Sequence, residues 1–192
     1  EFFWNEFCDW YLEMAKPALR NPDAEAGTRH TLAYVLENAL RLLHPFMPFI
    51  TEEIWQQLPH SAGAKDSIMI SAWPTVPAGM RDANAEAEMT LVMDIISAVR
   101  KQRADQGVPP AQKVAIRIAA ANSAVDEIIA PNETVLLILA RGEELSLSGS
   151  VAESTAEQVY WQGTPVEVTI SREVSPEERQ LELEKAKREL AK

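Results

Sequence analysis

The sequence predicts a mainly α-helical protein in which a helical bundle is followed by a small α+β subdomain and a terminal helix. Apolar residues recur every three or four positions through most of the first part of the chain, as in helices that bury one face. From residue 113, short segments alternate apolar and polar residues, as half-buried strands do. The last residues are rich in charge. These observations predict a bundle over 1–110, an α+β subdomain over 111–174 and a terminal helix over 175–192.

The first predicted helices lead into a proline-rich turn. Apolar positions predict a helix from Phe2 to Leu19 that weakens at Pro17, because proline removes a backbone donor. The Asn-Pro-Asp sequence at 21–23 predicts a turn, and the next periodic run predicts a helix over 28–43. Two prolines then interrupt the helix within the segment 44–49.

The remainder of the predicted bundle begins with a capped helix. Thr51 is the predicted N-cap, and Glu52 and Glu53 place negative charge at the first turn, where backbone donors are unpaired. This helix is expected to end near Leu58. The following elements are a loop over 59–66, an extended segment over 67–74 and a helix over 84–106.

The α+β subdomain is predicted from a change of periodicity. Its expected elements are strands over 113–118, 144–147 and 165–170, and two short helices over 122–130 and 132–140. The terminal helix follows a cap at Ser175. Its apolar spacing fits both a solvated helix and the start of a coiled coil, and periodicity alone leaves both open.

Composition excludes several classes of function. Eighteen Lys and Arg against 29 Asp and Glu give a net charge of −11, which argues against a protein that coats nucleic acid or anionic membranes non-specifically. The single cysteine and the three histidines offer no zinc spacing, and no apolar run reaches the roughly 20 residues of a membrane span. We expect a cytoplasmic protein without a membrane partner.

The sequence contains no recognisable catalytic motif. A phosphate-binding glycine loop, a nucleophile elbow and a metalloprotease helix are all missing. We therefore expect no catalytic residue, no metal site, no cofactor and no enzymatic activity in this chain. Because the chain begins at Glu1 in a helical pattern without an initiator methionine, we also expect it to be part of a longer protein.

Positive charge concentrates in one segment. Arg100, Lys101, Arg103, Lys113 and Arg117 lie in a stretch that contains a single acidic residue. Local basic side chains can reverse the repulsion that an acidic body exerts on phosphate, so this segment is a candidate for nucleic acid contact. Arginines near a helix end can instead stabilise the helix dipole, and that alternative stays open.

Aromatic residues crowd the N-terminal segment. Their helical spacing indicates that most of them form core, although an exposed member could stack on an unpaired base. Trp4 is the candidate for such stacking.

Three sequence blocks resemble one family. They are WNEFCDWYLEMAKP at 4–17, TRHTL at 28–32 and LRLLHPFMPFITEEIW at 40–55, and in order and spacing they resemble the anticodon-binding domain of valyl-tRNA synthetases over residues 2–118. The equivalent domain of isoleucyl and leucyl synthetases is a related alternative. The resemblance implies a part of a class I synthetase that lacks the catalytic and editing domains. The implied parent enzyme is monomeric, uses ATP and Mg²⁺ to ligate valine to its tRNA, and carries a C-terminal coiled-coil arm that begins near Ser175.

The resemblance also implies a tRNA partner and contact residues. Residues 99–110 are similar to the family's Arg-x-x-Arg, acidic, Asn and Pro pattern, which transfers to Arg100 and Arg103, while Gly107 stands where an asparagine is usual. Unstacked anticodon bases would be read by stacking and edge contacts, and cations would hold phosphates. The predicted contacts are Arg100, Lys101, Arg103 and Lys113, with Lys16, Arg20, Arg29 and Arg41 as weaker candidates on the bundle. A protein-interaction or scaffold module is the alternative function.

Overall fold

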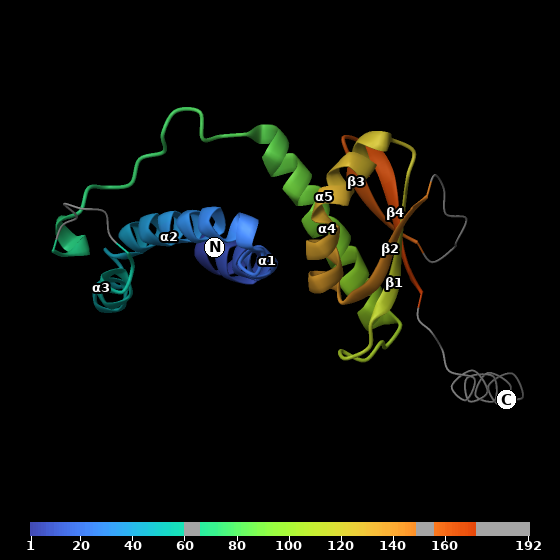
Figure 1. Ribbon diagram of the computed structural model, residues 1–192, viewed down its shortest axis with the longest axis horizontal. Coiled ribbons are helices and arrows are strands. Elements are labelled where there is room, and N and C mark those ends of the chain that lie inside the picture. Colours follow the sequence, from blue (N-terminus) through green and yellow to red (C-terminus); the bar gives the residue numbers. More distant parts are fainter. Residues whose placement is uncertain (60–65, 149–155, 172–192) are drawn as a thin grey trace, which may run out of the picture. The chain divides into compact units, whose positions relative to one another are not determined.

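The computed structural model describes residues 1–59, 66–148 and 156–171 (Figure 1). It confirms a mainly helical protein with a small α+β part. The chain forms two compact units, which divide between Asp82 and Ala83. The predicted boundary at residue 110 differs from this division, because the helix before it packs on the sheet that follows it. The predicted terminal helix at 175–192 lies outside the described residues.

The first unit opens with a π-helix. This element, η1, spans Phe2–Tyr11 and continues into α1, Leu12–Ala18, with Pro17 inside its last turn. A π-helix closes its hydrogen bonds five residues apart, and residues four apart still lie on nearly the same face. Phe7 is buried against the rings of Phe3 and Tyr11, with centroids 5.6 and 5.9 Å away, whereas the side chain of Trp4 is 70% exposed. The aromatic stripe is therefore core at its centre and exposed at its edge.

Helix α2, Pro22–Leu43, begins earlier than predicted. Asn21 Oδ1 accepts a hydrogen bond from the Asp23 N–H at 3.1 Å, and Pro22 occupies the first helical position, where its missing donor costs nothing. The Asn-Pro-Asp sequence predicted as a turn is thus a helix start. The helix after it, α3, spans Pro48–Gln56.

Thr51 lies inside α3 and is not its N-cap. Proline again favours the first position, so α3 starts at Pro48 and Thr51 falls one turn later, where it is buried. Its hydroxyl donates to the Met47 carbonyl at 2.8 Å, and its Oγ1 lies 2.8 Å from His44 Nδ1. The threonine therefore joins the proline-rich turn to the helix.

Glu52 holds the next segment on α3. Its carboxylate accepts hydrogen bonds from Ser67 Oγ and Gln56 Nε2, both at 2.8 Å, and these bonds lower its pKa. The segment predicted as extended at 67–74 instead begins with a short 3₁₀ helix, η2, Ile68–Ile70. Ile68 packs with Leu40 and Trp55 in the buried core of this unit.

The second unit pairs two helices with a four-stranded sheet. Its elements are α4 (Ala83–Asp105), β1 (Val114–Ala120), α5 (Ser123–Ala140), β2 (Gly142–Ser148), β3 (Glu157–Trp161) and β4 (Thr164–Ser171). The strand order is β2-β1-β4-β3, with β1 parallel to β2 and antiparallel to β4, and β3 antiparallel to β4. Both helices cover the same side of the sheet (Figure 1). The strands predicted near 113–118, 144–147 and 165–170 are confirmed, and β3 was not predicted.

Helix α5 is one helix where the sequence predicted two. Pro131 lies inside it, and Asn122 caps its start by accepting from the Ala124 N–H at 3.0 Å. Ile129 and Leu136, on either side of the proline, are both buried, so packing holds the two halves in one continuous helix despite the lost donor. The helix is the crossover that a parallel pair of strands requires.

A buried glutamine of α4 completes the sheet. Gln102 Nε2 donates to the Val168 carbonyl at 2.7 Å, and its Oε1 accepts from the Ile170 N–H at 3.1 Å. The pairing of β3 with β4 ends at Glu157 opposite Val168, so the glutamine amide serves the backbone of β4 where its neighbour strand stops. Buried backbone groups need such partners.

Replacing this amide is expected to destabilise the second unit. Gln102→Ala leaves a buried donor and a buried acceptor of β4 unpaired, each at a cost of about 1–3 kcal/mol, so the free energy of unfolding should fall by about 2–6 kcal/mol. Urea denaturation followed by circular dichroism measures this. Gln106→Ala, at an exposed position of the following turn, is the matched control; an equal effect of both variants would contradict the role of Gln102.

Candidate nucleic acid interface

The eight predicted contact residues fall into two groups. Lys16, Arg20, Arg29 and Arg41 belong to the first unit, and Arg100, Lys101, Arg103 and Lys113 to the second. The structure gathers the second group around the C-terminal end of α4 and the loop that leads into β1.

Cations of the first unit mostly pair with a glutamate one helical turn earlier. The Lys16–Glu13 distance is 2.5 Å, the Arg29–Glu25 distance is 2.8 Å, and Arg41 pairs with Glu37. Pairs of this kind on a helix surface contribute only a few tenths of a kcal/mol, about 0.3–0.5, and exchange partners readily. Arg20, after α1, is exposed and forms no ion pair with a described residue.

Arg100 and Lys101 extend from α4 to other elements. Arg100 donates from Nε and Nη2 to the Leu139 carbonyl, at 3.2 and 3.1 Å. Lys101 Nζ lies 2.6 Å from Glu157 Oε1 at the start of β3, and this hydrogen bond and the opposite charge raise the lysine pKa. Both side chains remain exposed, so both are accessible to a ligand.

Arg103 is a buried arginine. Its residue is 8% exposed, and Nη2 donates to the carbonyls of Pro109 and Gln112 at 3.1 and 2.8 Å, while Nη1 donates to the Arg141 carbonyl at 3.5 Å. Burial and the nearby Arg141 guanidinium lower its pKa. The guanidinium therefore fixes the loop between α4 and β1 and points its donors inward. Sequence reasoning expected a phosphate contact here, and this geometry suits a positioning residue better.

The arginines stabilise a helix end, as one sequence alternative proposed, but the helix is α5 and not their own α4. Leu139 lies in the last turn of α5 and Arg141 is its C-cap residue. Carbonyls at that end lack partners within the helix and carry partial negative charge. Arg100 and Arg103 supply donors to two of them.

Lys113 and Arg141 are exposed cations at the same end of the sheet. Lys113 directly precedes Val114, whose N–H donates to the Arg141 carbonyl at 3.3 Å. Neither side chain forms an ion pair with any residue of the described ranges. Sequence reasoning missed Arg141, because no spacing signal connects it with the basic segment around Lys113; the parallel pairing of β1 and β2 brings them together.

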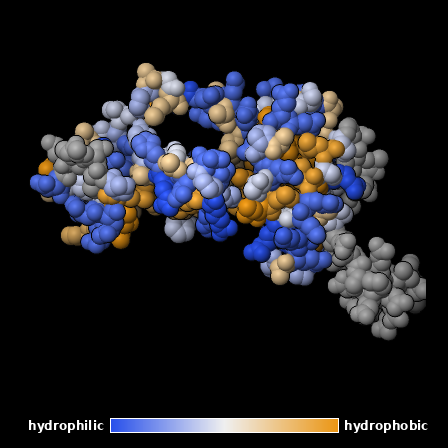
Figure 2. Space-filling view, viewed as in Figure 1, coloured by the Kyte–Doolittle hydropathy of each residue, from blue (hydrophilic) through white to orange (hydrophobic). Residues whose placement is uncertain are grey.

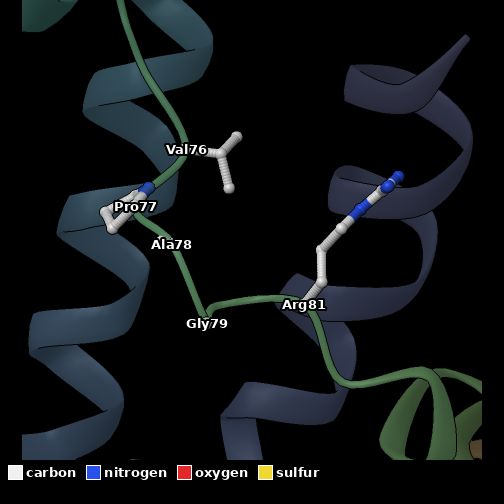
Figure 3. A pocket seen from close by; sticks show the side chains of 5 residues that line it. All are labelled: Val76, Pro77, Ala78, Gly79 and Arg81. Atoms are coloured by element: carbon white, nitrogen blue, oxygen red, sulfur yellow. The ribbon is translucent and has the colours of Figure 1, made fainter.

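Other surface features offer little chemistry. The loop residues Val76, Pro77, Ala78, Gly79 and Arg81 line an open depression of about 440 Å³, and Figure 3 shows Val76 and Arg81 projecting to one side of it. Figure 2 shows hydrophobic surface on the part of the first unit that contains α3. Among the residues in and just before this helix, Phe46 and Phe49 are 82% and 90% exposed.

Metal-binding clusters and membrane-spanning helices are both absent from the described residues. Within 1–59, 66–148 and 156–171 there is no group of three or more His, Cys, Asp or Glu placed to hold a metal ion. No helix in those ranges combines the length and apolar character needed to cross a membrane.

Weakening the Arg103 fork is expected to destabilise the second unit. Arg103→Lys keeps the charge but cannot serve three carbonyls with one planar fork, so we expect a loss of about 1–3 kcal/mol in the free energy of unfolding. Arg100→Lys, at an exposed arginine of the same helix, is the control and should lose less. Urea denaturation measures the free energy of unfolding of both variants. An unchanged value for Arg103→Lys would rule out a stabilising role of the Arg103 hydrogen bonds to the three carbonyls.

Comparison with known proteins identifies the family. Residues 1–118 match the anticodon-binding domain of tRNA ligase. A valine–tRNA ligase of Bacillus cereus is 47% identical over 148 residues, 76% of this chain and 16% of that protein. The enzyme of Geobacillus kaustophilus is 44% identical over 152 residues, 78% of this chain and 17% of the relative. That of Listeria innocua is 36% identical over 198 residues, 100% of this chain and 22% of the relative. The chain thus spans only a minor part of the relatives it matches, and it belongs to the family of tRNA ligase anticodon-binding domains.

Proposed function

We propose that the chain is the tRNA-binding part of a valine–tRNA ligase and that it recognises the anticodon end of a valine tRNA. The family match over residues 1–118 carries this proposal, and the names of the relatives support the choice of valine. The chain would act by recognition without chemistry. Ligation of valine, with the ATP and Mg²⁺ that it consumes and requires, would belong to the remainder of the longer enzyme.

The proposed contacts follow from exposure and pairing. Lys113 and Arg20 are exposed and have no ion pair among the described residues, so they can bind phosphate directly. Lys16, Arg29, Arg41 and Lys101 would exchange a glutamate for a phosphate, and Arg100 would add an exposed guanidinium. Arg103 would act indirectly by holding the loop before Lys113.

A protein-interaction module is the second candidate. The exposed rings of Phe46 and Phe49, three residues apart in the chain, favour it, because exposed apolar patches mark interaction sites. Association through this surface would depend little on salt, whereas binding of RNA weakens steeply as salt rises.

Exchange of the anticodon is the decisive test of the proposed function. The chain is titrated with a valine tRNA transcript, with the same tRNA carrying another anticodon, and with an unrelated tRNA, each at two salt concentrations. We expect the exchange to weaken binding by about tenfold or more, since each misread base costs about 1–3 kcal/mol. Equal affinity for the three RNAs would contradict anticodon recognition by this chain.

Trp4 is expected to stack on an unpaired base. Loss of one base–aromatic stack costs about 1–3 kcal/mol, so Trp4→Ala should weaken valine tRNA binding by about 5- to 150-fold. Trp73→Ala is the matched control, because Trp73 is 62% exposed and lies in the loop after η2. Fluorescence anisotropy compares the two variants, and equal losses would count against stacking on Trp4.

A further inference from the structure

The starts of β1 and β2 form one corner of the sheet. Val114 pairs with Gly142 in the parallel ladder, so the residues immediately before them, Lys113 and Arg141, lie on adjacent chain segments. The Val114 N–H donates to the Arg141 carbonyl at 3.3 Å, which ties these segments together. Both Lys113 and Arg141 are exposed. We call these two residues the cationic corner.

Positive charge at this corner exceeds what the protein itself neutralises. Burial lowers the pKa of Arg103, and the like charge of the nearby Arg141 guanidinium lowers it further. The C-terminal end of α5 is equivalent to about half a negative charge, which offsets only part of two guanidiniums. Carboxylates are nearby in sequence, at Asp105, Glu143 and Glu144, yet none forms an ion pair with the corner in the described part of the chain.

The backbone holds Arg141 in an uncommon conformation. Its φ of 54° lies in the left-handed region, where glycine or asparagine usually ends a helix. The next residue, Gly142, has little room for a side chain, because a Cβ there would come within 2.7 Å of side-chain atoms of Ile116 and Leu137. The glycine of this pair therefore lies in the strand, and the arginine occupies the left-handed position. Residues in strained backbone conformations are concentrated at functional sites. Arg141 is such a residue, and it is exposed beside Lys113, a second cation without an ion pair in the described ranges.

From this geometry we propose that Lys113 and Arg141 each bind a backbone phosphate of RNA, with Arg103 as the residue that positions them. The inference rests on the proposed function and extends its RNA contact beyond residue 118, where the family match ends. A guanidinium fork can bind two phosphate oxygens, and the lysine adds a point charge. Arg103 supports this arrangement by binding the Arg141 carbonyl and the carbonyl of Gln112, next to Lys113.

The slope of log K against log salt tests the proposal. The chain and its Arg141→Gln/Lys113→Gln variant are titrated with fluorescent valine tRNA between about 50 and 200 mM salt. Each lost phosphate contact reduces the slope by about 0.7–0.9, so the variant should have a slope shallower by about 1.5. The charge-preserving variant Arg141→Lys/Lys113→Arg should keep the slope of the original chain.

Two further variants separate binding from folding and from net charge. Arg141→Gly removes the charge and suits the left-handed backbone, so it should remain folded by circular dichroism and still lose about 0.7–0.9 of the slope. Arg81→Gln removes the same charge from an exposed arginine outside the predicted contacts and should leave the slope unchanged.

Each outcome is decisive. An unchanged slope in the double variant, while the chain still distinguishes anticodons, overturns the cationic corner and leaves the proposed function intact. If Arg141→Gly and Arg81→Gln reduce the salt slope equally, the effect comes from net charge alone, and the proposal for the cationic corner is overturned as well. If the original chain binds no tRNA, both proposals fail. Salt-sensitive capture of an acidic peptide in place of tRNA would assign the corner to protein and overturn its RNA role.

Discussion

The second unit depends on one turn of α4 whose side chains are bound on every side. Consecutive residues of a helix point about 100° apart, so four in a row spread around the whole axis. Arg100, Lys101, Gln102 and Arg103 reach the end of α5, the start of β3, the backbone of β4 and the loop before β1. This turn therefore sets where both helices and the sheet edge lie.

The same turn divides the cations of this unit into those with an internal partner and those without one in the described ranges. Its arginines serve the carbonyls of α5 and the loop, and its lysine faces a glutamate. Lys113 and Arg141 have no such internal partner in the described ranges. The basic segment thus divides into residues that build the unit and residues that face outward, although nothing in their chemistry alone distinguishes the two sets.

Periodicity predicted the elements whose pattern is regular and missed those that packing decides. The strands β1 and β4 alternate clearly, and α4 has a long apolar face, so all three were predicted near their observed positions. Helix α5 was divided because a proline normally ends a helix, and β3 is too short to show a period. The domain boundary followed a change of composition, whereas the structure divides where contacts are few.

The candidate site was predictable as a segment but not as a geometry. Sequence located the basic residues from 100 to 113, yet the burial of Arg103 depends on carbonyls contributed by residues up to Arg141. Such partners are distant along the chain. The same holds for Gln102, whose partners Val168 and Ile170 in β4 lie 66 and 68 residues further along the chain. During synthesis, α4 leaves the ribosome well before β4 exists, so its glutamine remains solvated until Ile170 has emerged. Closing so long a loop is slow, and the assembly of this unit is therefore a late event in the folding of the chain.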